Sequence, residues 1–255
     1  MSTTSIRSRC TRPGVGERTE GNYAGGVPLA ERGLRKMHTA MFKAVPGPGG
    51  VGQPVYTGLH VIAGCMYSGK SEELIRILSL WKHTGIDIEV YTHGSSVQTG
   101  DGFLKSRAGT RFPAQLISSL REIKWRRNGG QRIIAIDEAQ FFDEAEAPII
   151  AALADRALVI VAGLDTDFRG EPFQLMAAVL AMADSVTKLS AVCARCKTPG
   201  ATFTQRLING KPAPYESPRF MPGDADLYEP RCRRCYERPP RVDDKNVRLF
   251  ELEEV

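Results

Sequence analysis

The chain has 255 residues, of which 42% are apolar and 25% are charged. This is the composition of an ordinary globular protein, and it excludes collagen-like, fibrous and wholly disordered classes. No apolar run approaches the roughly 18 residues of a membrane-spanning helix, and we expect neither a membrane span nor a signal peptide. The net charge of +5 lies entirely in residues 1–57, which hold eight Lys/Arg and three Asp/Glu. The remainder is neutral, so we do not expect the folded part to bind nucleic acid.

Residues 1–57 are rich in glycine and proline, above all in the stretch 45–54. Such a composition opposes regular structure, and it predicts a mostly disordered basic tail with a short helix at 29–42. Two roles stay open for this tail: a targeting or contact arm, or no specific role.

Order is expected to begin at residue 58, with strands and helices that alternate along the chain. Strands joined by helical crossovers predict a parallel α/β sheet, here a P-loop NTPase-like domain over residues 58–189. Cysteines, prolines and arginines then replace the periodic pattern, which predicts a small zinc-ribbon domain at 190–238 and a charged C-terminal end at 239–255. The expected elements are strands at 59–63, 86–92, 132–137 and 158–163, helices at 71–81, 117–126 and 173–183, and a loop at 93–101.

The first chemical motif follows the strand at 59–63 and opens the helix at 71–81. It matches G-x-x-x-x-G-K-[ST], the pattern of a phosphate-binding P-loop. Backbone N–H groups and the helix N-terminus would face phosphate oxygens, Lys70 would add a charge, and the Ser71 hydroxyl would bind Mg²⁺. The alternative is a glycine-rich turn with an incidental lysine. The motif comprises Gly64, Cys65, Met66, Tyr67, Ser68, Gly69, Lys70 and Ser71.

The second motif is a pair of acids, Asp137 and Glu138, at the end of the strand at 132–137. That strand would carry Asp137 to the same sheet edge as the P-loop, where an acid can hold the Mg²⁺ shell. Glu138 would accept a proton from an attacking hydroxyl or water. The alternative is that both acids cap the next helix.

The third motif is two C-x-x-C pairs in a chain without a secretion signal, which favours a metal over disulfides. Four thiolates with no open position suit structural zinc. Because the pairs are not expected to form disulfides, they indicate a reducing cytoplasm. The alternative is four unrelated free thiols, while Cys65 is expected to be a buried filler. The zinc ligands would be Cys193, Cys196, Cys232 and Cys235.

Five motifs in order resemble the cytosolic-type (type II) thymidine kinases over residues 58–238. They are G-x-M-[FY]-S-G-K-S, I-D-E-x-Q-F-F, G-L-D-x-x-F-R-G-x-P-F, K-L-x-A-V-C-x-x-C and a final C-x-x-C. In this chain they occupy residues 64–71, 136–142, 163–173, 188–196 and 232–235.

The resemblance implies a P-loop α/β domain, a zinc-bearing lasso domain, and transfer of the γ-phosphoryl group of ATP to the 5′-hydroxyl of thymidine or deoxyuridine. It also implies a homotetramer and feedback inhibition by thymidine triphosphate (dTTP). Glu138 takes the position of the general base. The P-loop residues together with Asp137, Glu138 and Gln140 take the positions that bind ATP. The positions that contact the nucleoside fall on Met66, Phe141, Leu164, Phe168, Phe173, Thr204, Gly223 and Tyr228.

The chain departs from the family pattern in two loops. Where the family carries D-x-R near the phosphoryl-transfer centre, this chain has residues 96–98, Ser-Val-Gln, and neither charge is present. Asp101 and Arg107 are candidates to replace them, and loss of a cation there can cost several orders of magnitude in rate. The lasso also carries a proline in the stretch Arg219–Gly223 where the family usually has an aliphatic residue.

Two alternative functions follow from these departures and from the arginines near the cysteines. One is a nucleotide-binding paralogue with little or no kinase activity. The other is a P-loop ATPase whose zinc ribbon contacts nucleic acid.

Overall fold

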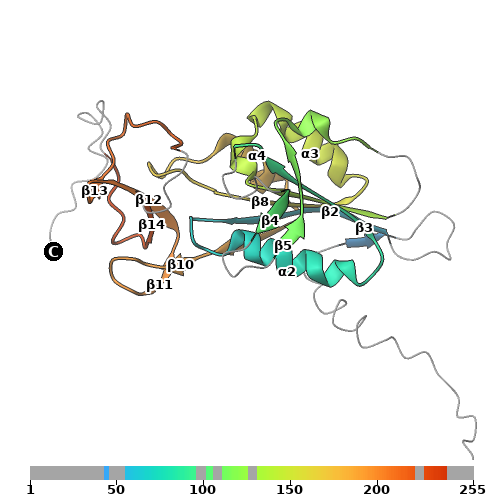
Figure 1. The fold of residues 1–255 in the computed structure, drawn as a ribbon, viewed down its shortest axis with the longest axis horizontal. Coiled ribbons are helices and arrows are strands. Elements are labelled where there is room, and N and C mark those ends of the chain that lie inside the picture. The colour runs from blue at the N-terminus through green and yellow to red at the C-terminus, as the bar shows by residue number, and fades with distance from the viewer. Residues whose placement is uncertain are drawn as a thin grey trace, which may run out of the picture.

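A computed structural model describes residues 43–45, 55–95, 102–105, 111–125, 131–221 and 227–239. Most of them belong to an α/β domain with a smaller β module at one end (Figure 1). The α/β domain contains β1 (Lys43–Val45), β2 (Val55–Gly64), α2 (Lys70–Lys82), β3 (Asp87–His93), β4 (Phe103–Lys105), β5 (Arg111–Pro113), β6 (Gln115–Ile117), β7 (Arg132–Asp137), α3 (Ala147–Ala154), β8 (Leu158–Gly163), α4 (Gln174–Met182) and β9 (Ser185–Leu189).

The main sheet has the strand order β1-β2-β8-β7-β3-β6, and β9 also pairs with β2. All these pairs are parallel except β1 with β2. Parallel strands end at the same sheet edge, and the register places Ala63 beside Gly163 and Thr92 beside Asp137. The loops that follow β2, β7 and β8 therefore meet at one edge, as the alternating pattern predicted.

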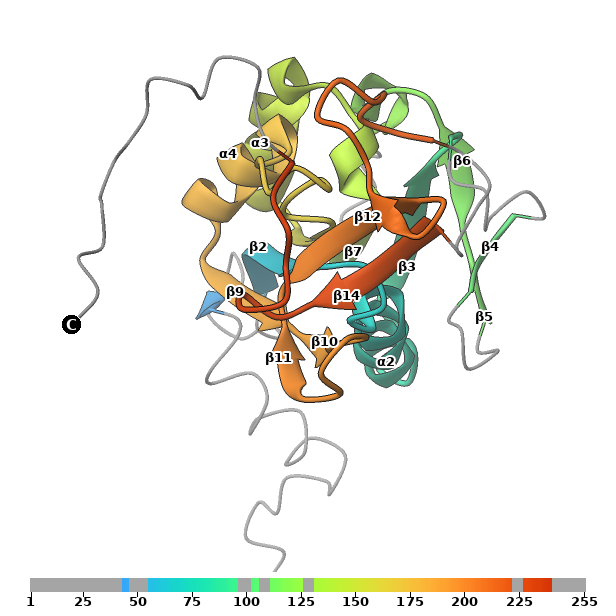
Figure 2. The ribbon, with the colours of Figure 1, turned by 90° about the vertical axis from the view of Figure 1, so that its left-hand side faces the viewer.

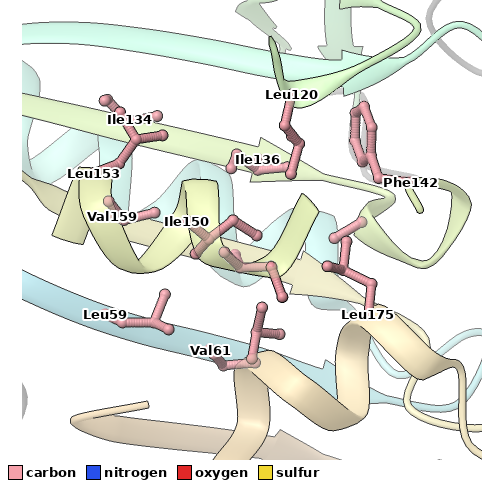
Figure 3. Close-up of a cluster of buried hydrophobic side chains, with 14 of the residues drawn as sticks. Leu59, Val61, Leu120, Ile134, Ile136, Phe142, Ile150, Leu153, Val159 and Leu175 are labelled. Atoms are coloured by element: carbon pink, nitrogen blue, oxygen red, sulfur yellow. The ribbon is translucent and has the colours of Figure 1, made fainter. Parts of the chain in front are cut away.

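Helices cover both faces of this sheet (Figure 1). On one face α2 buries Leu74, Ile75, Ile77, Leu78 and Trp81, which recur at the three- and four-residue spacing of a helix,. On the other face α3 and α4 pack against the sheet, and Figure 3 shows their Ile150 and Leu175 over strand residues such as Val61 and Ile136. Each such aliphatic side chain contributes about 1.5–3 kcal/mol when fully buried.

Two central strands, β7 and β8, are buried at every position. Because helices cover both faces, these strands read as continuous apolar runs instead of alternating patterns. The predicted strands at 132–137 and 158–163 match them residue for residue.

The predicted helix at 117–126 was wrong. Ile117 pairs with His93 as the last residue of β6, and the turn η2 (Leu120–Glu122) follows. Ser119 and Glu122 form a capping box for this single turn, but the chain returns to extended backbone at Ile123. The apolar residues that suggested a helix therefore belong to two different elements, an edge strand and a short turn. Both elements bury apolar side chains on the α3 side of the sheet.

The small module after Ser190 consists of short strands joined by turns. Figure 2 shows them side by side at one end of the main sheet. In this module β12 pairs with β13 and β14, and β10 pairs with β11. The strands are β10 (Ala191–Val192), β11 (Pro199–Ala201), β12 (Phe203–Ile208), β13 (Lys211–Pro212) and β14 (Tyr228–Arg231).

Two pieces of the predicted tail at 1–57 form strands. These are β1 and the first residues of β2, which pair antiparallel at Lys43–Thr57 and Val45–Val55. The expected helix at 29–42 lies outside the described residues. Among the helices in the described ranges, none has the length and hydropathy needed to cross a membrane.

Candidate active site and metal centre

The phosphate-binding loop joins the end of β2 to the start of α2. Two of its glycines have positive φ, 156° at Gly64 and 84° at Gly69. A Cβ atom on Gly64 would lie 2.6 Å from the carbonyl oxygen of Leu189, at the end of β9. Only glycine lets the loop begin this close to the neighbouring strand.

The loop is closed by bonds to the carbonyl oxygen of Cys65. The Ser68 hydroxyl donates to it at 2.8 Å, and the Lys70 ammonium donates to it at 2.9 Å. Burial lowers the pKa of the Lys70 ammonium, and the neighbouring carboxylates of Glu138 and Asp137 oppose that shift. A bound phosphate would supply a further counter-charge at this amine.

Asp137 ends β7 and is 3% exposed. The Ser71 hydroxyl, in the first turn of α2, donates to its carboxylate at 3.0 Å. Burial raises the pKa of Asp137 to about 7, and the charge of Glu138 adds to the shift while the Ser71 hydrogen bond opposes it. The sheet has thus brought together the hydroxyl and carboxylate oxygens that Mg²⁺ prefers, at a carboxylate whose charge a cation would stabilise. The donor set fits that ion.

Glu138 follows Asp137 and is partly exposed. Its backbone is left-handed, with φ of 54°, which is uncommon for a residue with a side chain,. This backbone turns the chain into η3 (Ala139–Phe141), where the Phe141 N–H donates to the Glu138 carbonyl at 3.2 Å. The alternative, in which both acids cap the next helix, does not hold for Glu138, because its side chain makes no capping bond to η3.

The four cysteines of the two C-x-x-C pairs come together in the small module. Their sulfurs all lie within 4.8 Å of one another, and the Cys196 and Cys232 sulfurs are 3.7 Å apart. Four thiolates at Zn–S distances of about 2.3 Å form a tetrahedron with edges of about 3.8 Å. The cluster therefore fits the predicted zinc, with Cys193, Cys196, Cys232 and Cys235 as its ligands.

The small module contacts the P-loop directly. The Met66 N–H donates to the Thr204 hydroxyl at 3.0 Å, and the Cys65 thiol donates to the Ala201 carbonyl at 3.3 Å. Cys65 is fully buried, as predicted, and burial raises the pKa of its thiol. The P-loop and the small module are therefore in contact through hydrogen bonds that each involve a main-chain group.

The predicted aromatic residues lie on both sides of this junction. Phe141 packs edge to face against Phe220 of the small module, with ring centroids 4.6 Å apart. Phe168 is buried, and the guanidinium of Arg206 lies 4.7 Å from its ring centroid and 5.7 Å from that of Tyr228.

Two arginines to which the sequence analysis gave no role tie the module to the loop after β8. Arg219 donates to the Asp167 carboxylate at 2.9 Å and lies 4.8 Å from the ring centroid of Phe173. Arg169 donates to the carbonyls of Tyr215 and Ser217, both at 2.8 Å. These hydrogen bonds join residues that are distant in the sequence. A local sequence pattern therefore does not predict them.

A comparison with family models matches the thymidine kinase model to residues 57–236. The chain belongs to the thymidine kinase family. As a member, it is an enzyme, a kinase acting on thymidine. A thymidine kinase of Chloroflexus aurantiacus is 41% identical over 183 residues, which cover 70% of this chain and 94% of that protein. One of a Roseiflexus species is 43% identical with the same coverage.

Among solved structures, ATPases 2 and 3 of EccC from Thermomonospora curvata share a TM-score of 0.32 and 13% identity with this chain. The match covers 58% of this chain and 34% of that one, and it is too weak to support a conclusion.

Some sites that the family pattern predicts lie outside the described residues. These are the loop at 96–98 that replaces D-x-R, the candidate substitutes Asp101 and Arg107, and the nucleoside position Gly223. The family's lasso motif is described up to Met221 and from Leu227 onward.

Proposed function

We propose that this thymidine kinase transfers the γ-phosphoryl group of ATP to the 5′-hydroxyl of thymidine or deoxyuridine, in nucleotide salvage. The observation that carries this proposal is the hydrogen bond between Ser71 and Asp137. It joins the P-loop to the acid at the end of β7, and Glu138 is the next residue. Phosphate-binding groups and a partly exposed carboxylate thus share one sheet edge.

In this scheme the P-loop amides and Lys70 bind the β- and γ-phosphates. Ser71 and Asp137 would hold Mg²⁺, which neutralises phosphate charge when it is bound. Glu138 accepts the proton of the 5′-hydroxyl. The hydroxyl oxygen then forms the new bond to the γ-phosphorus, the bond to the β,γ-bridging oxygen breaks, and ADP leaves.

The nucleoside site lies between the loops after β7 and β8 and the small module. Phe141, Phe168, Phe173 and Tyr228 supply aromatic surface there, and Thr204 supplies a hydroxyl beside Met66. Leu164 and Gly223 complete the set that the family resemblance gives. Zinc has a structural role, because it joins the two ends of a long irregular segment and so lowers the entropy cost of ordering it.

The assembly and regulation of the enzyme rest on the family resemblance. By this resemblance, we propose that the enzyme is a homotetramer and that dTTP inhibits it by feedback. Cysteine pairs that serve a metal in place of disulfides favour a reducing cytoplasm as its compartment.

A second candidate is a nucleotide-binding protein without appreciable turnover. It is favoured by the uncharged Ser-Val-Gln sequence at 96–98. A third candidate, a zinc ribbon that contacts nucleic acid, is weakened by the structure. Arg195 and Arg231 beside the cysteines form ion pairs with Glu237 and Glu229.

The test is ATP-dependent formation of thymidine monophosphate by the full zinc-loaded chain with Mg²⁺. Turnover of about 1 s⁻¹ or more supports the proposal, since enzymes commonly work in that range. Binding of ATP and thymidine without product would favour the second candidate. Salt-dependent retention on DNA, caused by counterion release, would favour the third.

A further inference from the structure

Gln140 contacts the proposed general base directly. Its side-chain amide nitrogen donates to the Glu138 carboxylate at 2.5 Å, and its amide oxygen accepts from the Leu164 N–H at 2.9 Å. The side chain is 7% exposed. It therefore links the carboxylate after β7 to the main chain after β8, the neighbouring parallel strand.

These two partners fix the orientation of the amide. A carboxylate can only accept a hydrogen bond, and a main-chain N–H can only donate one. The nitrogen of Gln140 must therefore face Glu138, and its oxygen must face Leu164. A glutamate at this position would keep the bond from Leu164 and lose the bond to Glu138, and a leucine would lose both.

Gly163 leaves room for this arrangement. A Cβ atom at Gly163 would lie 2.9 Å from the amide oxygen of Gln140 and 2.7 Å from the sulfur of Met176. A larger residue at the end of β8 would therefore clash with the Gln140 amide. The glycine belongs to the sequence motif at 163–173, and its contact with Gln140 gives a packing reason for its presence.

We propose that Gln140 is a positioning residue that holds the Glu138 carboxylate in one orientation. The inference rests on the proposed role of Glu138 as the base. The left-handed backbone of Glu138 sets the direction in which its side chain leaves the main chain. The hydrogen bond from Gln140 then fixes the position of the carboxylate group.

The test compares the full chain with Gln140→Glu and Gln140→Leu. Both variants lose the donor to Glu138, so kcat should fall about 10- to 100-fold, as expected for a displaced catalytic group. If Gln140 acts through Glu138, the KM for ATP should change less than about threefold; a rise in that KM that matches the fall in kcat would instead support the ATP-binding role predicted for Gln140 and overturn the positioning role.

Two further outcomes would overturn the inference. If Gln140→Glu keeps the wild-type kcat while Gln140→Leu loses activity, the amide only anchors the Leu164 main chain. If Gln140→Glu lowers kcat by the same factor in a Glu138→Gln background as in the wild type, the amide does not act through Glu138. That background also separates the two proposals, because a fully active Glu138→Gln enzyme would refute the base role by itself. Gln140→Glu has almost the volume of the wild-type residue, and equal thermal midpoints would show that it folds.

Discussion

The α/β domain and the small module are stabilised in different ways. In the α/β domain, helices bury apolar side chains on both faces of a parallel sheet, and β7 and β8 are buried throughout. The module has short strands, a four-cysteine cluster, and arginines bonded to distant carbonyls and carboxylates. The α/β domain therefore places the catalytic groups on a packed core, whereas the module depends on a few specific cross-links. A substitution at the catalytic edge should change chemistry, and one in the module should change order and nucleoside binding.

The largest effect should come from breaking the metal cluster with Cys232→Ser. A cluster with one thiolate removed binds zinc poorly, and the segment between the cysteine pairs would lose its anchor. We expect thymidine affinity to fall by more than about 100-fold while ATP affinity falls by less than about 10-fold, the latter through the Met66–Thr204 contact,. Metal analysis and separate titrations of the two ligands measure this. Equal loss of both affinities would contradict the division of roles between the two regions.

Lys70→Ala should act on the other region alone. Loss of the ammonium at the β- and γ-phosphates should lower kcat/KM for ATP about 100- to 1,000-fold and leave thymidine binding within about threefold. Because burial disfavours the Lys70 charge in the free protein, the thermal midpoint without ligand should stay the same or rise,. A large drop in that midpoint would mean that Lys70 has a structural role.

Arg219→Ala should produce an intermediate effect. It removes the ion pair to Asp167, whose side chain is 1% exposed, and the packing on Phe173. Since a buried carboxylate would lose one of its partners, the free energy of unfolding should fall by about 1–3 kcal/mol. The KM for thymidine should rise about 10-fold with kcat nearly unchanged. This is the pattern expected when a lost contact stabilises the bound substrate and the transition state equally. Arg76→Ala is the matched control, because the Arg76 pair with Glu73 is exposed,. Equal effects of the two substitutions would refute the special role of Arg219.

The smallest effect should be a pH dependence that originates in the sheet. His60 on β2 is fully buried and hydrogen-bonds to Ser185 and Thr187 of β9. Burial lowers the pKa of His60 below 6.5, although Glu73 and the Ser185 hydrogen bond oppose this. The unfolded chain therefore takes up a proton before the folded chain does, and stability is lost as the pH falls below about 6.5. His60→Gln should show a smaller drop in thermal midpoint between about pH 7.5 and about pH 5.5, and an unchanged drop would exclude His60 as the cause.

The sequence predicted the helices and strands whose apolar residues follow a regular pattern, and the binding sites that match a short motif. The three- and four-residue spacing of apolar residues located α2, and short continuous apolar runs located β7 and β8, which are buried on both faces,. The P-loop and the two cysteine pairs were predicted because phosphate and zinc binding require particular residue types at short spacings. The Ser71–Asp137 contact followed from the rule that parallel strands end together.

The remainder depends on contacts between distant segments. The helix predicted at 117–126 was wrong because one apolar spacing served an edge strand and a turn. Arg169, Arg206 and Arg219 were missed as parts of the site, although Arg169 lies in the motif at 163–173. The partners that they bind are distant in the sequence, and no local pattern identifies those partners. Gln140 was predicted to bind ATP, and that role stays a prediction. Its amide contacts with Glu138 and Leu164 became visible only once β7 and β8 were adjacent.

The most direct test of the proposed chemistry is the turnover of Glu138→Gln beside the wild type, with ATP and thymidine affinities measured on both. The substitution keeps the size of the side chain and removes the proton acceptor. We expect both ligands to bind within about threefold of wild type and thymidine monophosphate formation to fall at least about 100-fold, the order of magnitude that general-base catalysis supplies. Wild-type turnover in Glu138→Gln would contradict the assignment of Glu138 as the base.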